Sequence, residues 1–281
     1  MNGKPPPRVL AIAGSDSSGG AGIQADIKTI TMLGGYAMTA VTAVTAQNSV
    51  GVQAIAPMSG DVVAEQIASC LGDIGVDAVK IGMLHDRAII DAVAAALEAL
   101  PDSVPVVLDP VMIATSGATL IAADAIAAMR DKLFPLATLI TPNLPELEHL
   151  VGRTLRDTVE IAEAARDLAR TYAAHVLAKG GHTDDDRVID TLAGPGEQRS
   201  AAFGDARIDT PHTHGTGCTL SSAIATLQGH GVPLEHAVRL GRQFVRRAII
   251  AAPGFGAGNG PLGHQAVRAG PLDGNDQADS S

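Results

Sequence analysis

Short apolar segments alternate with longer amphipathic segments along most of the chain, and this alternation limits the folds open to it. Apolar residues fill the short segments almost completely, so strands formed there would be buried on both faces. The longer segments repeat apolar residues at helical spacing, which gives each helix one apolar face to set against a sheet. The sequence therefore predicts an α/β fold in which helices cover both faces of a central parallel sheet.

The same pattern gives the expected elements. We expect strands over residues 8–13, 36–46, 77–81, 104–108, 137–140 and 175–178, and weaker strands over 187–192 and 199–203. We expect helices over residues 21–33, 61–71, 86–99, 122–133, 144–150, 157–172, 216–229 and 233–251. No internal repeat interrupts this order, so one large domain is favoured over two small ones.

The composition changes near Pro253, after which glycine, proline, aspartate and serine predominate. Such a segment buries too little apolar surface to offset the entropy lost on ordering it. We therefore expect one folded domain over residues 1–258 and a disordered tail over residues 259–281.

Charge and cysteine content disfavour several function classes. The chain carries 20 Lys+Arg against 30 Asp+Glu and has no basic cluster, which disfavours nucleic acid and anionic membranes as partners. Two cysteines, Cys70 and Cys218, are too few for a disulfide framework. The N-terminal residues lack the apolar core of a signal peptide, and no run of about 18 apolar residues occurs. A cytoplasmic protein is the expectation.

Open parallel sheets bind ligands beyond the carboxyl ends of their strands, so we expect one functional rim. The loops that would form it cover residues 14–20, 47–49, 82–85, 109–117, 141–146, 179–183 and 204–217. Functional residues are therefore expected in these loops and at the helix ends that follow them.

The first of these loops belongs to the glycine-rich stretch G-S-D-S-S-G-G-A-G, residues 14–22. It lacks the Lys-Ser/Thr pair of a P-loop and the G-x-G-x-x-G fingerprint of dinucleotide-binding proteins, so by itself it predicts only a tight turn. The helix behind it carries Asp26 on the same face as Ile23 and Ile30. A buried carboxylate is costly unless it is paired or binds a ligand, and both alternatives stay open.

Gln47 stands where the second apolar segment ends, within T-A-Q-N-S. An amide offers a donor and an acceptor together, which suits the edge of a heteroaromatic ring. An ordinary turn residue is the alternative.

Three polar side chains could hold a divalent cation. Asp109 ends an apolar strand, and Asn143 and Glu146 follow the next strand on one helical turn. Together they could bind Mg²⁺ through water. Alternatively, Asn143 is a helix N-cap and Glu146 completes a capping box.

Lys179 ends another strand, just before Gly180 and Gly181. Its ammonium group could reach a phosphate at the rim. Alternatively, its stem lies along apolar surface and its charge stays in solvent.

The stretch H-G-T-G-C at residues 214–218 leads into a helix. Gly215, Thr216 and Gly217 let the backbone approach a ligand, and the unpaired N–H groups of the helix end form an anion hole. Cys218 lies in the first turn, where the helix dipole is expected to lower the thiol pKa from about 8.5. Cys218 could therefore act as a base or a nucleophile.

The remaining cysteine and a pair of histidines are weaker candidates for functional residues. Cys70 shares an apolar stripe with Val63 and Ile67, which predicts an inert buried thiol. His212 and His214 have the spacing of a metal pair, yet no third ligand is spaced to join them, so metal binding there is disfavoured.

Seven blocks in order carry a family resemblance: A-G-S-D-S-S-G-G-A-G-I-Q-A-D, V-T-A-Q-N, V-K-I-G-M-L, V-L-D-P-V-M, L-I-T-P-N-L-P-E, A-K-G-G-H and H-G-T-G-C-T-L-S. With them the chain closely resembles the hydroxymethylpyrimidine/phosphomethylpyrimidine kinases of the ribokinase-like superfamily, over roughly residues 8–252. The resemblance implies a three-layer α/β/α sandwich with a mostly parallel central sheet. It also implies ATP-dependent phosphorylation of 4-amino-5-hydroxymethyl-2-methylpyrimidine and then of its monophosphate, in thiamine diphosphate synthesis.

The resemblance also implies roles for individual residues. Lys179, Thr216 and Asn143 would bind ATP, and Asp109 and Glu146 would serve Mg²⁺. Cys218 occupies the position of the catalytic Asp of sugar kinases, above the anion hole that Gly215 and Gly217 help to form. The pyrimidine pocket would be lined by Gly14, Ala21, Asp26, Gln47, Met83 and Val111.

A homodimer is implied as well. One departure from the family pattern is Ser17, where proline often follows the aspartate, and it puts the rigidity of that loop in doubt.

Three other functions are weighed against this one. A pyridoxal kinase acts on a similar methylated ring that bears a hydroxymethyl group. A dinucleotide-dependent oxidoreductase is suggested only by the glycine loop and the α/β alternation, and it lacks the fingerprint. A silent vitamin-binding module is disfavoured because Asn143, Glu146 and Cys218 are all present.

Overall fold

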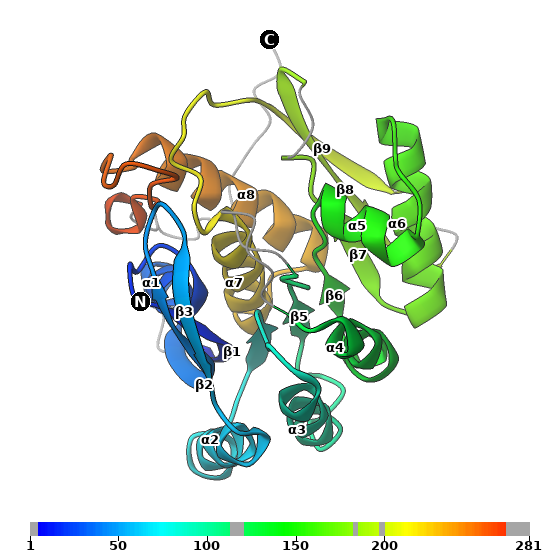
Figure 1. The fold of residues 1–281 in the computed structure, drawn as a ribbon. Coiled ribbons are helices and arrows are strands. Elements are labelled where there is room, and N and C mark those ends of the chain that lie inside the picture. The colour runs from blue at the N-terminus through cyan, green and yellow to red at the C-terminus, as the bar shows by residue number, and fades with distance from the viewer. Residues whose placement is uncertain (1–4, 113–120, 182–184, 197–199, 268–281) are drawn as a thin grey trace.

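A computed structural model describes residues 5–112, 121–181, 185–196 and 200–267 (Figure 1). The strands are β1 (Arg8–Asp16), β2 (Tyr36–Gln47), β3 (Val52–Pro57), β4 (Ala78–Ile81), β5 (Val106–Leu108), β6 (Leu139–Ile140), β7 (His175–Ala178), β8 (Arg187–Ala193) and β9 (Ala201–Ala206). The α-helices are α1 (Gly22–Met32), α2 (Gly60–Asp73), α3 (Arg87–Leu97), α4 (Ala123–Ala128), α5 (Leu144–Val151), α6 (Thr158–Tyr172), α7 (Thr216–Gly229) and α8 (Leu234–Ile250). A π-helical turn at Met129–Leu133 continues α4.

The strands form one sheet in the order β3-β2-β1-β4-β5-β6-β7-β8-β9. The six central strands of this order, β2-β1-β4-β5-β6-β7, run parallel to one another. At one edge β3 pairs antiparallel with β2, and at the other edge β8 and β9 add two further antiparallel pairings. The mostly parallel sheet is confirmed. The sequence did not predict β3, an edge strand without a buried residue and therefore without a strong apolar signal.

Alternate residues of the strands pack into two separate cores. Leu10 and Ile12 of β1 face a core that includes residues of α2, α3, α5 and α6. Val9 and Ala11 face the opposite core, which includes residues of α1, α7 and α8. Helices thus cover both faces of the sheet, and the three-layer sandwich is confirmed (Figure 1).

Helix α7 is buried on nearly every side, as expected of a helix packed between the sheet and other helices. Residues Thr219 to Leu227 are all buried, and α7 contacts α1, α8 and strands β1, β4 and β5. This packing fixes the N-terminus of α7 at the carboxyl ends of the strands.

Described residues beyond the predicted domain boundary at residue 258 pack onto the domain: Leu262, His264 and Val267 are each at most 4% exposed. The N–H group of Gly263 donates to the carbonyl of Ala248 at 2.9 Å. The apolar residues of this segment stand singly among polar and small residues, so composition hid them. Residues 268–281 of the predicted tail lie outside the described residues.

We expect a chain that ends after Ala257 to melt on the order of 10 °C below the full chain in a calorimetric scan. It loses the buried Leu262 and Val267, each worth about 1.5–3 kcal/mol. A chain that ends after Val267 is the matched control and should melt with the full chain. Equal melting temperatures for both shortened chains would show that the segment contributes nothing.

No helix in the described part of the chain has both the length and the apolar character needed to cross a membrane.

Candidate active site

A cavity of about 880 Å³ lies beyond the carboxyl ends of the parallel strands. The end of β2 and the loops after β1, β4, β5, β6 and β7 contribute to it, together with the N-terminus of α7, as expected of an open parallel sheet. All predicted site residues except Asp26 line it: Gly14, Ala21, Gln47, Met83, Asp109, Val111, Asn143, Glu146, Lys179, Gly215, Thr216, Gly217 and Cys218. Their roles stay predictions.

Asp16 organises the glycine-rich loop, a part that the sequence did not predict. Its carboxylate accepts hydrogen bonds from the backbone N–H groups of Ser18, Gly20 and Ala21 at 2.8–3.1 Å. Burial alone would raise the pKa of Asp16, but hydrogen bonds from His214, Ser18 and Ala21 bring it below its ordinary value. An ionised carboxylate therefore holds the loop in place.

Ser17, the departure from the family pattern, ties this loop to β2. Its hydroxyl donates to the carbonyl of Gln47 at 2.7 Å and accepts from the N–H group of Gln47 at 2.8 Å. The loop is thus fixed by two hydrogen bonds where a proline could not form them.

Asp26 does not line the cavity, so the prediction that it lines the pyrimidine pocket gains no support here. Its fully buried carboxylate accepts from the Lys80 ammonium at 2.8 and 2.9 Å and from the Ser222 hydroxyl at 2.7 Å. Of the two alternatives for this buried carboxylate, a paired group or a ligand-binding group, the structure contains the ion pair, with Lys80 as the partner. Lys80 was not predicted to take part, although a lysine within an apolar strand was a visible signal.

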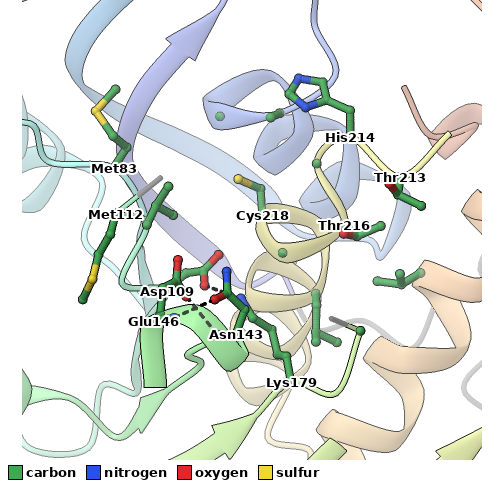
Figure 2. A pocket seen from close by; sticks show the side chains of 18 of the residues that line it. Met83, Asp109, Met112, Asn143, Glu146, Lys179, Thr213, His214, Thr216 and Cys218 are labelled. Atoms are coloured by element: carbon green, nitrogen blue, oxygen red, sulfur yellow. Dashed lines mark hydrogen bonds and ion pairs between the residues drawn. The ribbon is translucent and has the colours of Figure 1, made fainter. Parts of the chain in front are cut away.

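Lys179 and Asp109 form an ion pair at the other side of the cavity (Figure 2). The two charged groups are 2.7 Å apart, and Thr141 donates to the same carboxylate oxygen at 3.0 Å. Burial favours the neutral amine, but Asp109 and Glu146 outweigh it and raise the pKa of Lys179. A permanent cation therefore lies where the sequence placed a phosphate-binding lysine.

Asn143 and Glu146 form a capping box at the start of α5, as the alternative interpretation had it. The Asn143 side chain accepts from the N–H group of Glu146, and the Glu146 carboxylate accepts from the N–H group of Asn143, each at 2.9 Å. Both residues still line the cavity. Burial raises the pKa of Glu146 to about 7, an effect that Lys179 opposes and Asp109 reinforces.

The donor set suits Mg²⁺ bound through its substrate rather than in a protein cage. Within the described ranges, no group of three His, Cys, Asp or Glu side chains could hold a metal ion. Mg²⁺ usually binds through one or two carboxylates together with waters and substrate phosphates, and Asp109 and Glu146 both line the cavity. The residues present therefore fit this ion.

Glycines bring the N-terminus of α7 close to charged groups. Gly215 has a φ of 87°, and a Cβ there would collide with the carbonyl oxygen of Gly20. A Cβ on Gly217 would lie 3.1 Å from Asp109 Oδ2 and 3.2 Å from Lys179 Nζ. The first-turn N–H groups, which have no acceptor within the helix, thus lie next to the Lys179 ammonium. This is an anion-binding arrangement.

The predicted lowering of the Cys218 pKa is wrong in direction. Burial raises the pKa of this thiol to about 11; Asp26 and Asp109 add to the rise, and the Lys80 charge opposes it. The helix dipole acts on a group that has lost most of its contact with water, and the loss of hydration outweighs it. Cys218 is therefore a neutral thiol near neutral pH, and it lines the cavity together with Met83 and the Asp109–Lys179 pair (Figure 2).

Helix α8 and strand β8 supply lining residues that the sequence did not predict: Val188, Asp190, Arg242, Val245, Arg246 and Ile249. Arg242 pairs with both Asp190 and Asp205. The run R-Q-F-V-R-R in the last helix was the available signal, but nothing local showed that it faces the rim.

Two remaining candidates also have structural partners. His214 pairs with Asp16 at 2.9 Å instead of joining His212 on a metal. Cys70 packs against the larger core but is only partly buried, and burial raises its pKa.

The chain is similar to known kinases in both sequence and structure. A sequence model described as phosphomethylpyrimidine kinase matches residues 16–263. The thiamine biosynthesis bifunctional protein ThiED of Geobacter sulfurreducens is 46% identical, and the match spans 91% of this chain but 52% of that protein. A hydroxymethylpyrimidine/phosphomethylpyrimidine kinase of Haemophilus influenzae is 42% identical over 92% of this chain and 97% of its own. The pyridoxal kinase from Staphylococcus aureus in complex with AMP-PCP and pyridoxal is 33% identical, with a TM-score of 0.83 over 93% of this chain and 94% of that one.

Proposed function

The chain belongs to the phosphomethylpyrimidine kinase family, and on that premise we propose that its cavity carries out both phosphorylations of the hydroxymethylpyrimidine. ATP phosphorylates 4-amino-5-hydroxymethyl-2-methylpyrimidine at its hydroxymethyl group, and a second ATP phosphorylates the resulting monophosphate. The products serve thiamine diphosphate synthesis.

One observation carries this assignment: a single cavity has an amide, Gln47 beside His214, at one end and a cation, Lys179, at the other (Figure 2). Met83 and Cys218 line the same cavity. The pyrimidine binds at the amide end, and the phosphates of ATP lie along Lys179 and the N-terminus of α7. Phosphoryl transfer depends mainly on positioning and charge neutralisation, which these groups supply.

Asp109 and Glu146 would hold Mg²⁺ beside the phosphates, with Asn143 next to them. When bound, the ion neutralises charge on the phosphate oxygens. The chain's own contribution is to keep Lys179 protonated and to aim the α7 N–H groups at the same place.

A coupled assay that follows ADP release tests the function. With hydroxymethylpyrimidine, Mg²⁺ and excess ATP, we expect two ADP for each pyrimidine consumed. Release at the rate of the pyrimidine-free control would refute the assignment, and one ADP per pyrimidine would refute the second phosphorylation.

We expect Gln47→Leu to raise the KM for the pyrimidine by about 5- to 150-fold, since each unmade hydrogen bond in a dry pocket costs about 1–3 kcal/mol. The KM for ATP should change less than twofold because the phosphates bind elsewhere. Gln53→Leu, on the exposed surface of β3, is the matched control. A pyrimidine KM within twofold of the unmodified value would make Gln47 a turn residue only.

Pyridoxal kinase activity is the second candidate, because a pyridoxal kinase shares the whole fold with this chain. Turnover of pyridoxal and hydroxymethylpyrimidine, measured side by side with the same enzyme, separates the two. We expect kcat/KM to favour the pyrimidine.

The proposal extends to a homodimer in the cytoplasm. Val44 on β2 and Val50 in the turn after it are exposed apolar side chains that a second copy would cover. Light scattering behind a sizing column measures the mass, and a monomer at micromolar concentration would contradict the dimer.

A further inference from the structure

His214 lies at the amide end of the cavity, where it contacts Asp16 and Gln47. It is 6% exposed, and its Nε2 atom is 2.9 Å from Asp16 Oδ2 and 3.4 Å from the side-chain amide of Gln47. A Cβ on Gly20 would collide with the imidazole ring, so the ring is packed against this backbone. The position of the ring is thus fixed from two sides.

The Asp16 contact decides which nitrogen of His214 carries a proton. An ionised carboxylate only accepts hydrogen bonds, so the Nε2 atom that faces it must be a donor. Hydrogen bonds lower the pKa of Asp16 although burial opposes them, so the carboxylate stays ionised near neutral pH. His214 therefore presents an Nε2–H group in both its neutral and its charged form.

The Nε2–H group in turn restricts the Gln47 amide. The two ends of this amide lie 3.4 Å from His214 Nε2 and 3.2 Å from Thr45 Oγ1. Thr45 donates its single hydroxyl proton to the carbonyl of Ser15 at 2.9 Å, so its oxygen can only accept a further bond. An amide with Nε2 toward His214 would set two donors against each other and two acceptors against each other.

A half-turn of the amide removes both conflicts. Gln47 Nε2 then donates to Thr45 Oγ1, and Gln47 Oε1 accepts from His214 Nε2–H, which Asp16 shares. Each contact in the chain from Asp16 to Ser15 then joins a donor to an acceptor. The alternative leaves buried polar groups unpaired, which costs about 1–3 kcal/mol for each group.

We propose that His214 is a positioning residue that, held by Asp16, fixes the orientation of the Gln47 amide and so decides which ring edge the cavity accepts. The inference rests on the proposed function, in which Gln47 contacts the pyrimidine. A fixed amide presents one donor and one acceptor at set places, which matches the ring nitrogen and the neighbouring amino group of an aminopyrimidine. Pyridoxal carries an aldehyde next to its hydroxymethyl group, where the pyrimidine carries the amino group, and so offers a different pattern.

The proton arrangement can be tested without any substrate. Long-range nitrogen–proton NMR of the ¹⁵N-histidine-labelled protein reads the tautomer of each ring, and we expect His214 to carry its proton on Nε2. A proton on Nδ1 alone would overturn the proposal. Neutron diffraction of the free protein should show Gln47 Oε1, not Nε2, facing His214, and the opposite orientation would equally overturn it.

The effect on recognition is tested with His214→Leu and His214→Gln, since a glutamine Nε2–H can replace the histidine donor. We expect His214→Leu to raise the Kd for hydroxymethylpyrimidine about tenfold, with the Kd for a non-hydrolysable ATP analogue within twofold. His214→Gln should recover the pyrimidine Kd to within about threefold. His236→Leu, which replaces an exposed histidine of α8, is the matched control.

A double-mutant cycle separates positioning from general damage. In a Gln47→Leu background, His214→Leu should change the pyrimidine Kd by less than twofold, because its route to the ring is already gone. His214→Leu alone should also lower the preference for pyrimidine over pyridoxal. The proposal would be overturned if the rises in Kd of the two single variants multiplied in the double variant, or if His214→Leu left the preference for pyrimidine over pyridoxal unchanged. If the unmodified enzyme binds no pyrimidine, the proposed function fails, while the NMR result still decides the proton arrangement.

Discussion

Cys218→Ala is expected to slow the first phosphorylation by about 10²- to 10⁴-fold and the second by much less. In the first step a neutral hydroxymethyl group must lose a proton as it attacks the γ-phosphorus, and the thiolate form of Cys218, a small fraction at neutral pH, is the base that would take it. In the second step the acceptor is a phosphate oxygen that is largely ionised near neutral pH, because the second pKa of a phosphate monoester is about 6. Single-turnover measurements with the alcohol and with the monophosphate compare the steps directly.

ATP binding is the control for this variant. The backbone N–H groups of Gly215 to Cys218 survive the substitution, so the Kd for an ATP analogue should change little. Equal slowing of both steps would leave Cys218 as a packing residue beneath the transferred phosphate.

The high pKa of Cys218 should make the rate of the first phosphorylation depend on pH. A group with a pKa of about 11 is almost fully protonated at pH 7, and its thiolate fraction rises about tenfold for each pH unit up to about pH 10. The rate of the first step should therefore rise with pH over this range, whereas the second step should stay nearly flat. The rise should vanish in Cys218→Ala. Iodoacetamide labelling of Cys218, which also needs the thiolate, should follow the same pH curve.

The fold was predictable because its signals are local. Fully apolar strands and amphipathic helices each carry their pattern within a few residues, and β7 and α7 have the predicted bounds. The edge strand β3 was missed because its side chains are exposed or half-buried, so no buried face marks its sequence. The segment at 259–267 was missed because its stability comes from contacts with α1 and α8, not from its own composition.

The candidate site was predictable as a set of positions but not as a set of charge states. Strand order brings Gln47, Asp109 and Lys179 to one rim, and this follows from the alternation of elements alone. The Cys218 pKa depends instead on burial and on Asp26, far away in sequence. A helix dipole can be inferred from a sequence, whereas the water that surrounds a thiol cannot.

Because burial has such a large effect on charged groups, we expect the stability of the fold to depend strongly on the buried pair of Lys80 and Asp26. We expect Lys80→Met to lower the free energy of unfolding by about 3–5 kcal/mol, because it leaves the Asp26 carboxylate in the interior without its cation. Burial raises the pKa of Asp26 and would lower that of Lys80, but the attraction between the two groups, 2.8 Å apart, favours the charged pair and raises the pKa of Lys80. Urea unfolding measures the change. Lys132→Met, whose partner Asp91 is only half-buried, is the control and should cost about 1 kcal/mol or less.

The double variant Asp26→Leu with Lys80→Met decides what the carboxylate is for. Replacing both charges by apolar side chains of similar size removes the unpaired group, so most of the lost stability should return. A double variant as unstable as Lys80→Met would show that the loss came from packing rather than from an unpaired charge. Once the protein is stable again, the pyrimidine KM becomes informative. An unchanged KM would assign Asp26 to the interior, beneath the cavity that Cys218 lines, whereas a large rise would restore the substrate role that the family resemblance implies.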